Sequence, residues 1–159
     1  MLFLGLDQTI ENEGHDRNSL TLPGAQAELA LALAAAAKAP VVVVLVNGGP
    51  LAIGGLKDSA KVGAILEAFL PGQYGAEAAM QLLLGEASPS GLLPVTVYNN
   101  DVTKKRTITN LDLRAAGGIT YRYFTGTPLW TFGFGLSYAQ FELSSDAKAH
   151  KDPCCALLK

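Results

Sequence analysis

The 159-residue chain is poor in charge and shows no surplus of basic residues. Charged residues make up 16% of it, below the quarter typical of soluble domains, and the formal net charge is −2. Only residues 104–106 form a basic cluster, which a solvated turn explains. Because nucleic-acid-binding domains carry a strong basic footprint, we expect no nucleic-acid partner.

Long hydrophobic runs are also missing. The apolar run 41–46 has six residues between Pro40 and Asn47, whereas a membrane span needs about 18. The N-terminus has no basic residue ahead of its first apolar residues, so no signal peptide is expected there. The sequence therefore predicts a protein without a membrane partner.

Cysteine and histidine are scarce. Cys154 and Cys155 are adjacent, and neighbouring cysteines rarely bridge, so they build no disulfide framework. His15 and His150 lie far apart in the sequence, which argues against a metal site or a histidine-based triad. Residues 48–50 lack the glycine spacing of a phosphate-binding loop. We expect neither a metal nor a cofactor.

Apolar runs and helix-forming segments alternate in the first half of the chain. The apolar runs show no polar alternation, which is typical of strands covered on both faces of a parallel sheet. Pro23 and Pro40 bracket one helical segment, and Gly85 is a typical C-cap for the other. The fold class predicted is α/β, as a three-layer α/β sandwich with a mostly parallel sheet. The expected strands are residues 2–6, 41–46 and 62–68, and the expected helices are residues 22–40 and 75–84.

The second half has a different character. Residues 99–140 are rich in turns and aromatic residues, and we expect the aromatic side chains of the closing segment FGFGLSY, residues 132–138, to lie in the core. From about Ser144 the sequence is polar. We therefore predict a domain over residues 1–143 and a polar tail over residues 144–159.

One polar stretch, DQTIENEGHDRNSL at residues 7–20, directly follows the first expected strand. The loops that follow parallel strands gather at the carboxyl edge of the sheet, where ligands bind. This architecture places the stretch at the mouth of a candidate site.

Four segments, taken in order, carry a family resemblance. They are GLDQTIENEGHDRNSLTLPGAQ, VVVVLVNGGPLAI, AILEAFLPGQYGAEAAMQLLLGEASPSGLLPVTVY and TYRYFTGTPLWTFGFGLSYAQF. From about residue 2 to residue 141 the chain resembles the C-terminal α/β sandwich domain of family-three glycoside hydrolases, which include β-glucosidases, β-xylosidases and α-arabinofuranosidases. The motif GLDQTIENEGHDR is more similar to the xylosidase and arabinofuranosidase branch.

The resemblance implies a retaining enzyme that hydrolyses terminal non-reducing β-glycosidic bonds in oligosaccharides or glycosides. Its nucleophile is expected on an N-terminal (β/α) barrel, and its acid/base glutamate in a loop of the sandwich. This chain has no room for the barrel, and the sandwich is expected to be incomplete at its N-terminus. The isolated chain is therefore expected to be inactive, and the full-length protein to be secreted.

Glu11 and Glu13 are the two candidates for the acid/base. Counting from Gly5 puts the family position at Glu11, whereas counting back from the Asp16-Arg17 pair favours Glu13 in some members. Both stay open, with Glu11 preferred. Asp16 and Arg17 resemble the acid–arginine step of the family, and the planar fork of Arg17 suits it to holding the loop.

The sequence names no substrate-binding residue. The missing barrel also leaves an alternative function, a non-catalytic carbohydrate-binding or interaction module derived from such an enzyme.

Overall fold

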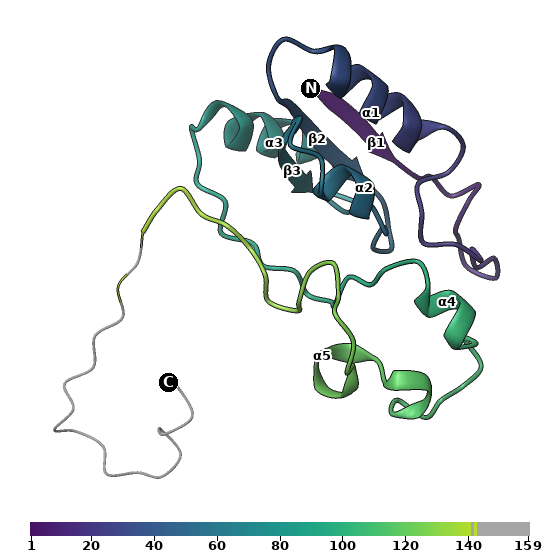
Figure 1. The fold of residues 1–159 in the computed structure, drawn as a ribbon. Helices are drawn as coiled ribbons and strands as arrows, with labels where there is room; N and C mark the ends of the chain where they lie inside the picture. Colours follow the sequence, from purple (N-terminus) through teal and green to yellow (C-terminus); the bar gives the residue numbers. More distant parts are fainter. Residues whose placement is uncertain (141, 143–159) are drawn as a thin grey trace, which may run out of the picture.

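A three-stranded parallel sheet forms the centre of the computed structural model, which describes residues 1–140 and residue 142 (Figure 1). The strands are β1 (Leu2–Gly5), β2 (Val41–Val46) and β3 (Val62–Glu67), in the order β1-β2-β3. In the register Leu4 lies opposite Leu45, and Leu45 opposite Glu67, so the three strands end at the same edge. The α/β class and the parallel sheet are confirmed.

Helices flank the sheet, with α1 and α3 on either side of the strands in Figure 1. The predicted segment 75–84 matches α3, and Gly85 ends it in the left-handed conformation at φ 75°. Segment 22–40 forms a helix only over the middle of its range, as α1. The helices are α1 (Gln26–Ala36), α2 (Gly54–Lys57), α3 (Gly75–Leu84), α4 (Val102–Lys105), η1 (Ala115–Gly117) and α5 (Thr120–Tyr123).

One face of the sheet carries the main core. Val43 and Leu45 of β2 are almost fully buried there against Ala30 of α1 and Leu56 of α2. Val44 points to the other face and is equally buried. Burial on both faces of β2 explains why its sequence is an apolar run without alternation.

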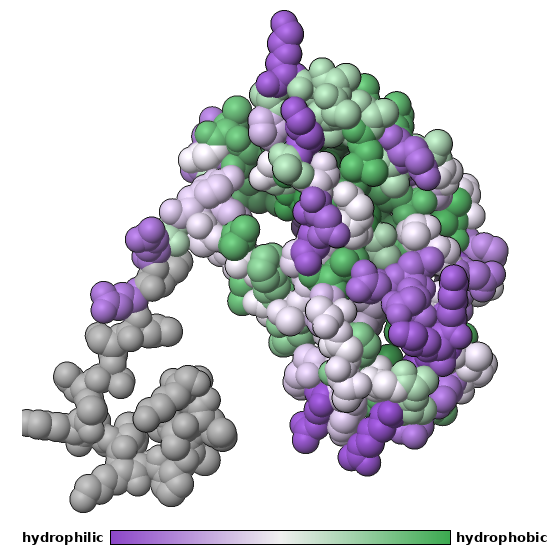
Figure 2. Space-filling view, in the orientation of Figure 1, coloured by the Kyte–Doolittle hydropathy of each residue, from purple (hydrophilic) through white to green (hydrophobic). Residues whose placement is uncertain are grey.

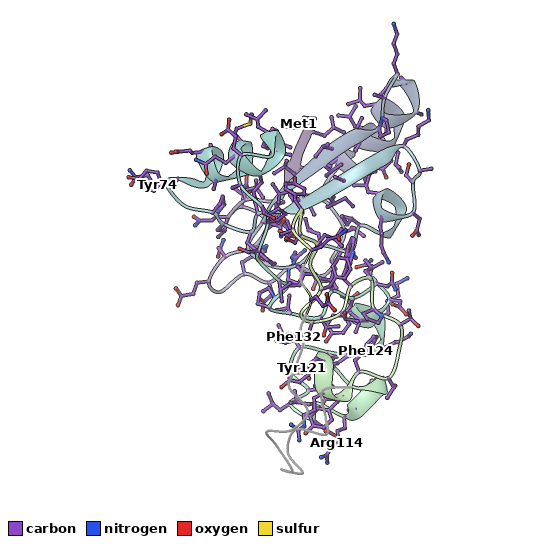
Figure 3. The ribbon with its side chains drawn as sticks, turned by 90° about the vertical axis from the view of Figure 1, so that its left-hand side faces the viewer. Met1, Tyr74, Arg114, Tyr121, Phe124 and Phe132 are labelled. Carbon is purple, nitrogen blue, oxygen red and sulfur yellow. The ribbon has the colours of Figure 1, made fainter. Side chains whose placement is uncertain are left out.

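Residues 99–140 lie below the sheet in Figure 1, as loops with three short helical elements. Leu129 N–H donates to Val97 C=O at 2.8 Å, next to an isolated antiparallel bridge between Val97 and Trp130, which ties this part of the chain to the segment after α3. Figure 3 places Tyr121 and Phe132 next to each other well away from the strands, and their ring centroids are 4.8 Å apart.

The aromatic side chains of residues 132–138 are exposed, so their predicted place in the core is wrong. Phe132 is 48% exposed, Phe134 40% and Tyr138 63%. The physical reason is that the described part of the chain places no second layer over this segment. The predicted tail, residues 144–159, lies outside the described residues, and the division into residues 1–143 and 144–159 stays a prediction.

Two further features concern the described residues alone. Their helices are all too short or too polar to cross a bilayer. Their His, Cys, Asp and Glu side chains nowhere form a group of three or more that could hold a metal ion.

Gln26, at the start of α1, is bonded to the end of the edge strand β1. Gly5 N–H donates to Gln26 Oε1 and Gln26 Nε2 donates to Gly5 C=O, both at 2.9 Å. The side-chain amide thus satisfies the two backbone groups that a neighbouring strand would otherwise pair. Gly5 tolerates no side chain, because a Cβ there would lie 1.8 Å from Val46 C=O. These contacts fix the direction in which the polar loop leaves the sheet.

We predict that Gln26→Ala lowers the free energy of unfolding by about 1–3 kcal/mol, because two partly buried backbone groups lose their partner. Urea denaturation followed by circular dichroism measures the change. Gln81→Ala on α3 is the matched control, since the Gln81 side chain makes only an exposed 3.4 Å contact with Glu77. Equal losses in the two variants would contradict the role given to Gln26.

Candidate functional site

The polar loop after β1 folds back on itself in two steps. Ile10 N–H and Glu11 N–H both donate to Asp7 C=O, which makes a turn directly after the strand. Asn12 and His15 then exchange two backbone hydrogen bonds, at 3.1 and 3.0 Å, and close a tight hairpin. Hydrophilic side chains gather in Figure 2 on the side where this loop and α4 lie in Figure 1.

Asp7 stabilises the first turn. Its carboxylate accepts hydrogen bonds from the Thr9 hydroxyl at 2.6 Å and from Thr9 N–H at 2.8 Å. These bonds, from the hydroxyl first, hold the pKa of Asp7 below its ordinary value. Asp7 is therefore engaged in loop structure.

Glu11 lies at the base of the hairpin and is held from two directions. Arg17 Nε donates to Glu11 Oε2, and Gly49 N–H donates to Glu11 Oε1 at 3.0 Å. Arg17 Nη2 also donates to Pro50 C=O at 2.9 Å. The Arg17 and Glu11 side chains are only 10% and 26% exposed. The pair therefore joins the loop after β1 to the turn after β2.

The turn after β2 has glycine where the ion pair approaches. A Cβ on Gly49 would lie 2.8 Å from Arg17 Nη2 and 3.0 Å from Glu11 Oε1. These separations are shorter than ordinary contacts, so a side chain at this position would displace the pair. The glycine thus lets the backbone N–H reach the carboxylate.

Glu13 and Asp16 lie apart from this cluster. Both side chains are exposed, and Glu13 lies within the hairpin closed by Asn12 and His15. Among the hydrogen bonds and ion pairs of residues 1–140, none uses either carboxylate. The structure therefore brings Glu11 and Arg17 together and leaves Glu13 and Asp16 facing solvent. The roles predicted for all four stay predictions.

Two residues at this edge were missed by the sequence analysis. Asn47 follows β2 and is fully buried, and Glu67 ends β3 in a partly buried position. Burial raises the pKa of Glu67, and hydrogen bonds from Phe69 N–H and the Asn47 side chain oppose the rise. The available signal was their position, since each stands at the end of an expected strand.

A hollow of about 460 Å³ lies beside the start of the loop. Its walls come from β1, the first turn of the loop and the start of α1, and neither candidate glutamate lines it. Glu13 lies on the open surface, whereas the Glu11 side chain is largely buried. Such a surface can present a carboxyl group to a ligand, but a second wall is needed to hold that ligand.

Comparison with known proteins adds the family context. Residues 1–138 match the family described as Glycosyl hydrolase family 3 C-terminal domain. Beta-D-xylosidase 1 from Arabidopsis thaliana is 43% identical over 144 residues, which cover 89% of this chain and 19% of that protein. Exo-1,4-beta-xylosidase xlnD from Aspergillus awamori is 37% identical over 152 residues, covering 93% of this chain and 19% of that protein.

Solved structures agree. A GH3 exo-beta-xylosidase (XlnD), in complex with a xylobiose aziridine activity-based probe, superposes with a TM-score of 0.87 at 35% identity. The match covers 91% of this chain and 20% of that one. Beta-D-glucoside glucohydrolase from Trichoderma reesei gives a TM-score of 0.73 at 29% identity, covering 91% of this chain and 22% of that one. The chain thus spans about a fifth of the length of the proteins it matches.

We predict that Arg17→Lys lowers the free energy of unfolding by about 1–3 kcal/mol, because an ammonium cannot bond Glu11 and Pro50 C=O with one planar fork. Thermal or urea unfolding measures the change. The control is Arg122→Lys, at an exposed arginine, which should leave stability nearly unchanged. If Arg17→Lys is as stable as the wild type, the pair does not hold the loop.

Proposed function

Because the chain belongs to the Glycosyl hydrolase family 3 C-terminal domain family, we propose that it is the acid/base domain of a retaining β-glycosidase. The substrate class proposed is a glycoside or oligosaccharide with a terminal non-reducing β-linked sugar. β-Xylosides are the first choice, because the relatives named above include Beta-D-xylosidase 1 and an exo-1,4-beta-xylosidase. α-Arabinofuranosides and β-glucosides are the alternatives.

A retaining glycosidase needs a carboxyl group that protonates the leaving oxygen and then, as a carboxylate, activates water. The group must have an oxygen free to meet the substrate. Both oxygens of Glu11 already accept hydrogen bonds from the protein, one from Arg17 and one from Gly49 N–H. Glu13 is exposed and two residues away. This difference supports Glu13 as the acid/base, in place of the Glu11 preferred by counting from Gly5.

Glu11 and Arg17 then have a supporting role. Their ion pair fixes the base of the hairpin against the turn after β2, so that the tip is presented at a constant place. Asp16 was the second residue expected to support the loop. Its carboxylate makes no hydrogen bond or ion pair within residues 1–140, and we assign the support to Arg17.

The nucleophile is proposed to lie outside this chain, on an N-terminal (β/α) barrel of the same protein. The chain spans 19% of the length of the Arabidopsis relative, so most of such a protein would come from elsewhere. The two carboxylates of a retaining pair lie about 5–5.5 Å apart, which requires the barrel to close over the hairpin. The open position of Glu13 leaves room for such a wall.

The acid/base assignment is testable in a chimera, in which this chain replaces the matched segment of Exo-1,4-beta-xylosidase xlnD from Aspergillus awamori. Glu13→Gln should lower kcat on xylobiose by roughly 10²–10⁴-fold, the usual contribution of a general acid. The loss should be much smaller with 4-nitrophenyl β-D-xyloside, whose leaving group needs no proton. Azide should restore turnover of this substrate by taking the place of the missing base.

Two variants serve as comparison in that chimera. Glu28→Gln, at an exposed position on α1, should change nothing. Glu11→Gln should lower the rate on both substrates without rescue by azide, because it loosens the hairpin and removes no proton donor. Azide rescue of Glu11→Gln together with full activity of Glu13→Gln would reverse the two roles.

The isolated chain gives a separate test of the alternative function. If the site is only half present, titration with xylobiose followed by NMR should show no saturable shift of the hairpin amides. Saturable binding in the millimolar range or tighter, lost in Glu13→Gln, would favour a stand-alone carbohydrate-binding module. Glu28→Gln is again the control for a nonspecific charge effect.

A further inference from the structure

A group of buried and half-buried residues beside the turn after β2 has no role in the function proposed above. It consists of Asn47 at the end of β2, Glu67 at the end of β3, and Phe69 two residues further on. We infer that Glu67 is a positioning residue, which acts through Phe69 and Asn47 on the turn that holds Glu11. The effect of Glu67 on catalysis rests on the proposed function, whereas its effect on the position of the turn does not.

Phe69 is the first sign that this corner is constrained. Its φ of 51° is left-handed, which is unfavourable for a bulky residue without a glycine's freedom. Both of its backbone polar groups are held: Phe69 N–H donates to Glu67 Oε1 at 3.1 Å, and Phe69 C=O accepts from Asn47 N–H at 3.1 Å. Glu67 and Asn47 thus keep a strained corner in place.

Asn47 links this corner to the turn after β2. Its Nδ2 donates to Gly49 C=O at 3.0 Å, and Gly49 N–H in turn donates to Glu11. A residue with no exposed surface and such a bond has little freedom to move. The position of Gly49 therefore depends on the position of the Asn47 amide.

The Asn47 amide also acts on the Glu67 carboxyl. Its side chain lowers the pKa of Glu67, which is the effect of an N–H directed at the carboxyl, and Nδ2 has a second N–H besides the one used by Gly49. The Glu67 carboxyl thus serves as an acceptor at this corner, most directly for Phe69 N–H.

Glu67 stands in partly apolar surroundings. Burial raises its pKa, and the groups that act against the rise, Phe69 N–H and the Asn47 amide, are neutral. Its register partner on β2 is Leu45, which is apolar. As the pH rises through this raised pKa, the Glu67 carboxyl becomes charged and accepts more strongly from Phe69 N–H. The change should pass through Phe69 and Asn47 to the Gly49 amide.

The direct test uses the Gly49 amide in NMR spectra of this chain. In the wild type its proton shift should show a step at the raised pKa of Glu67. Glu67→Gln should abolish that step and keep the bond from Gly49 to Glu11, because the glutamine amide oxygen still accepts from Phe69 N–H but does not titrate. Glu67→Leu should lose the bond and raise hydrogen exchange at Gly49 by about tenfold, as expected for one lost hydrogen bond.

Controls separate positioning from general loss of structure. The amides of Val43 and Leu45 report whether the sheet is intact, and Glu86→Gln, at an exposed carboxylate, should leave Gly49 unchanged. If the sheet is intact in Glu67→Leu and Gly49 neither shifts nor exchanges faster, the inference is wrong. The inference is also wrong if the pH step persists in Glu67→Gln.

The chimera distinguishes this inference from the proposed function. There Glu67→Leu should lower kcat on xylobiose by about tenfold with little change in KM, and Glu67→Gln should restore it. If Gly49 responds in NMR as expected while kcat stays constant, Glu67 positions the turn, but the catalytic role proposed for the loop is wrong.

Discussion

The ion pair between Glu11 and Arg17 is the contact on which the candidate site depends. It is the described interaction that ties the loop after the edge strand to the turn after the central strand, and both partners are largely withdrawn from solvent. Removing two charges from water is costly unless each finds further hydrogen bonds. Here Gly49 N–H and Pro50 C=O supply them. The backbone of the turn after β2 is therefore bonded to both members of the ion pair. Moving the turn or the loop after β1 would break the ion pair and these hydrogen bonds together.

The parallel sheet explains why these segments meet at all. Strands that run in the same direction end at the same edge, so the loops after β1, β2 and β3 are neighbours although 20 or more residues separate them in the sequence. Each loop brings a polar group to this edge: Glu11 from the first, Asn47 from the second and Glu67 from the end of the third strand. Gln26 belongs to the same arrangement, since its amide completes the free edge of β1 and fixes where the first loop begins.

Much of the fold could be predicted from the sequence, because its signals are local. The runs 41–46 and 75–84 are bounded by proline, asparagine or glycine, and the structure has the elements where those boundaries put them. The exposed aromatic side chains of residues 132–138 could not be predicted in this way, because hydrophobicity indicates that a surface seeks cover and does not say which segment supplies it. Likewise, a polar stretch of 14 residues gives no sign of which carboxylate turns inward. That depends on the Asn12–His15 hairpin, which forms through backbone bonds.

Glu11 and Glu13 are the same residue type two positions apart, and the hairpin gives them different environments. An extended segment would have pointed both side chains to the same side, where each could serve equally well as a proton donor. The turn instead commits Glu11 to guanidinium and amide donors and leaves Glu13 in solvent. Two carboxylates in unlike surroundings can take unlike roles, one as an anchor and one as a reactive group. Fixing the base of the hairpin through Glu11 matters only if its tip, which carries Glu13, must keep a constant position. The described residues place no surface opposite this tip, so they alone give no reason to fix it. If Glu13 is the acid/base, as proposed, the buried Glu11–Arg17 pair holds the hairpin ready for a second surface that closes over Glu13.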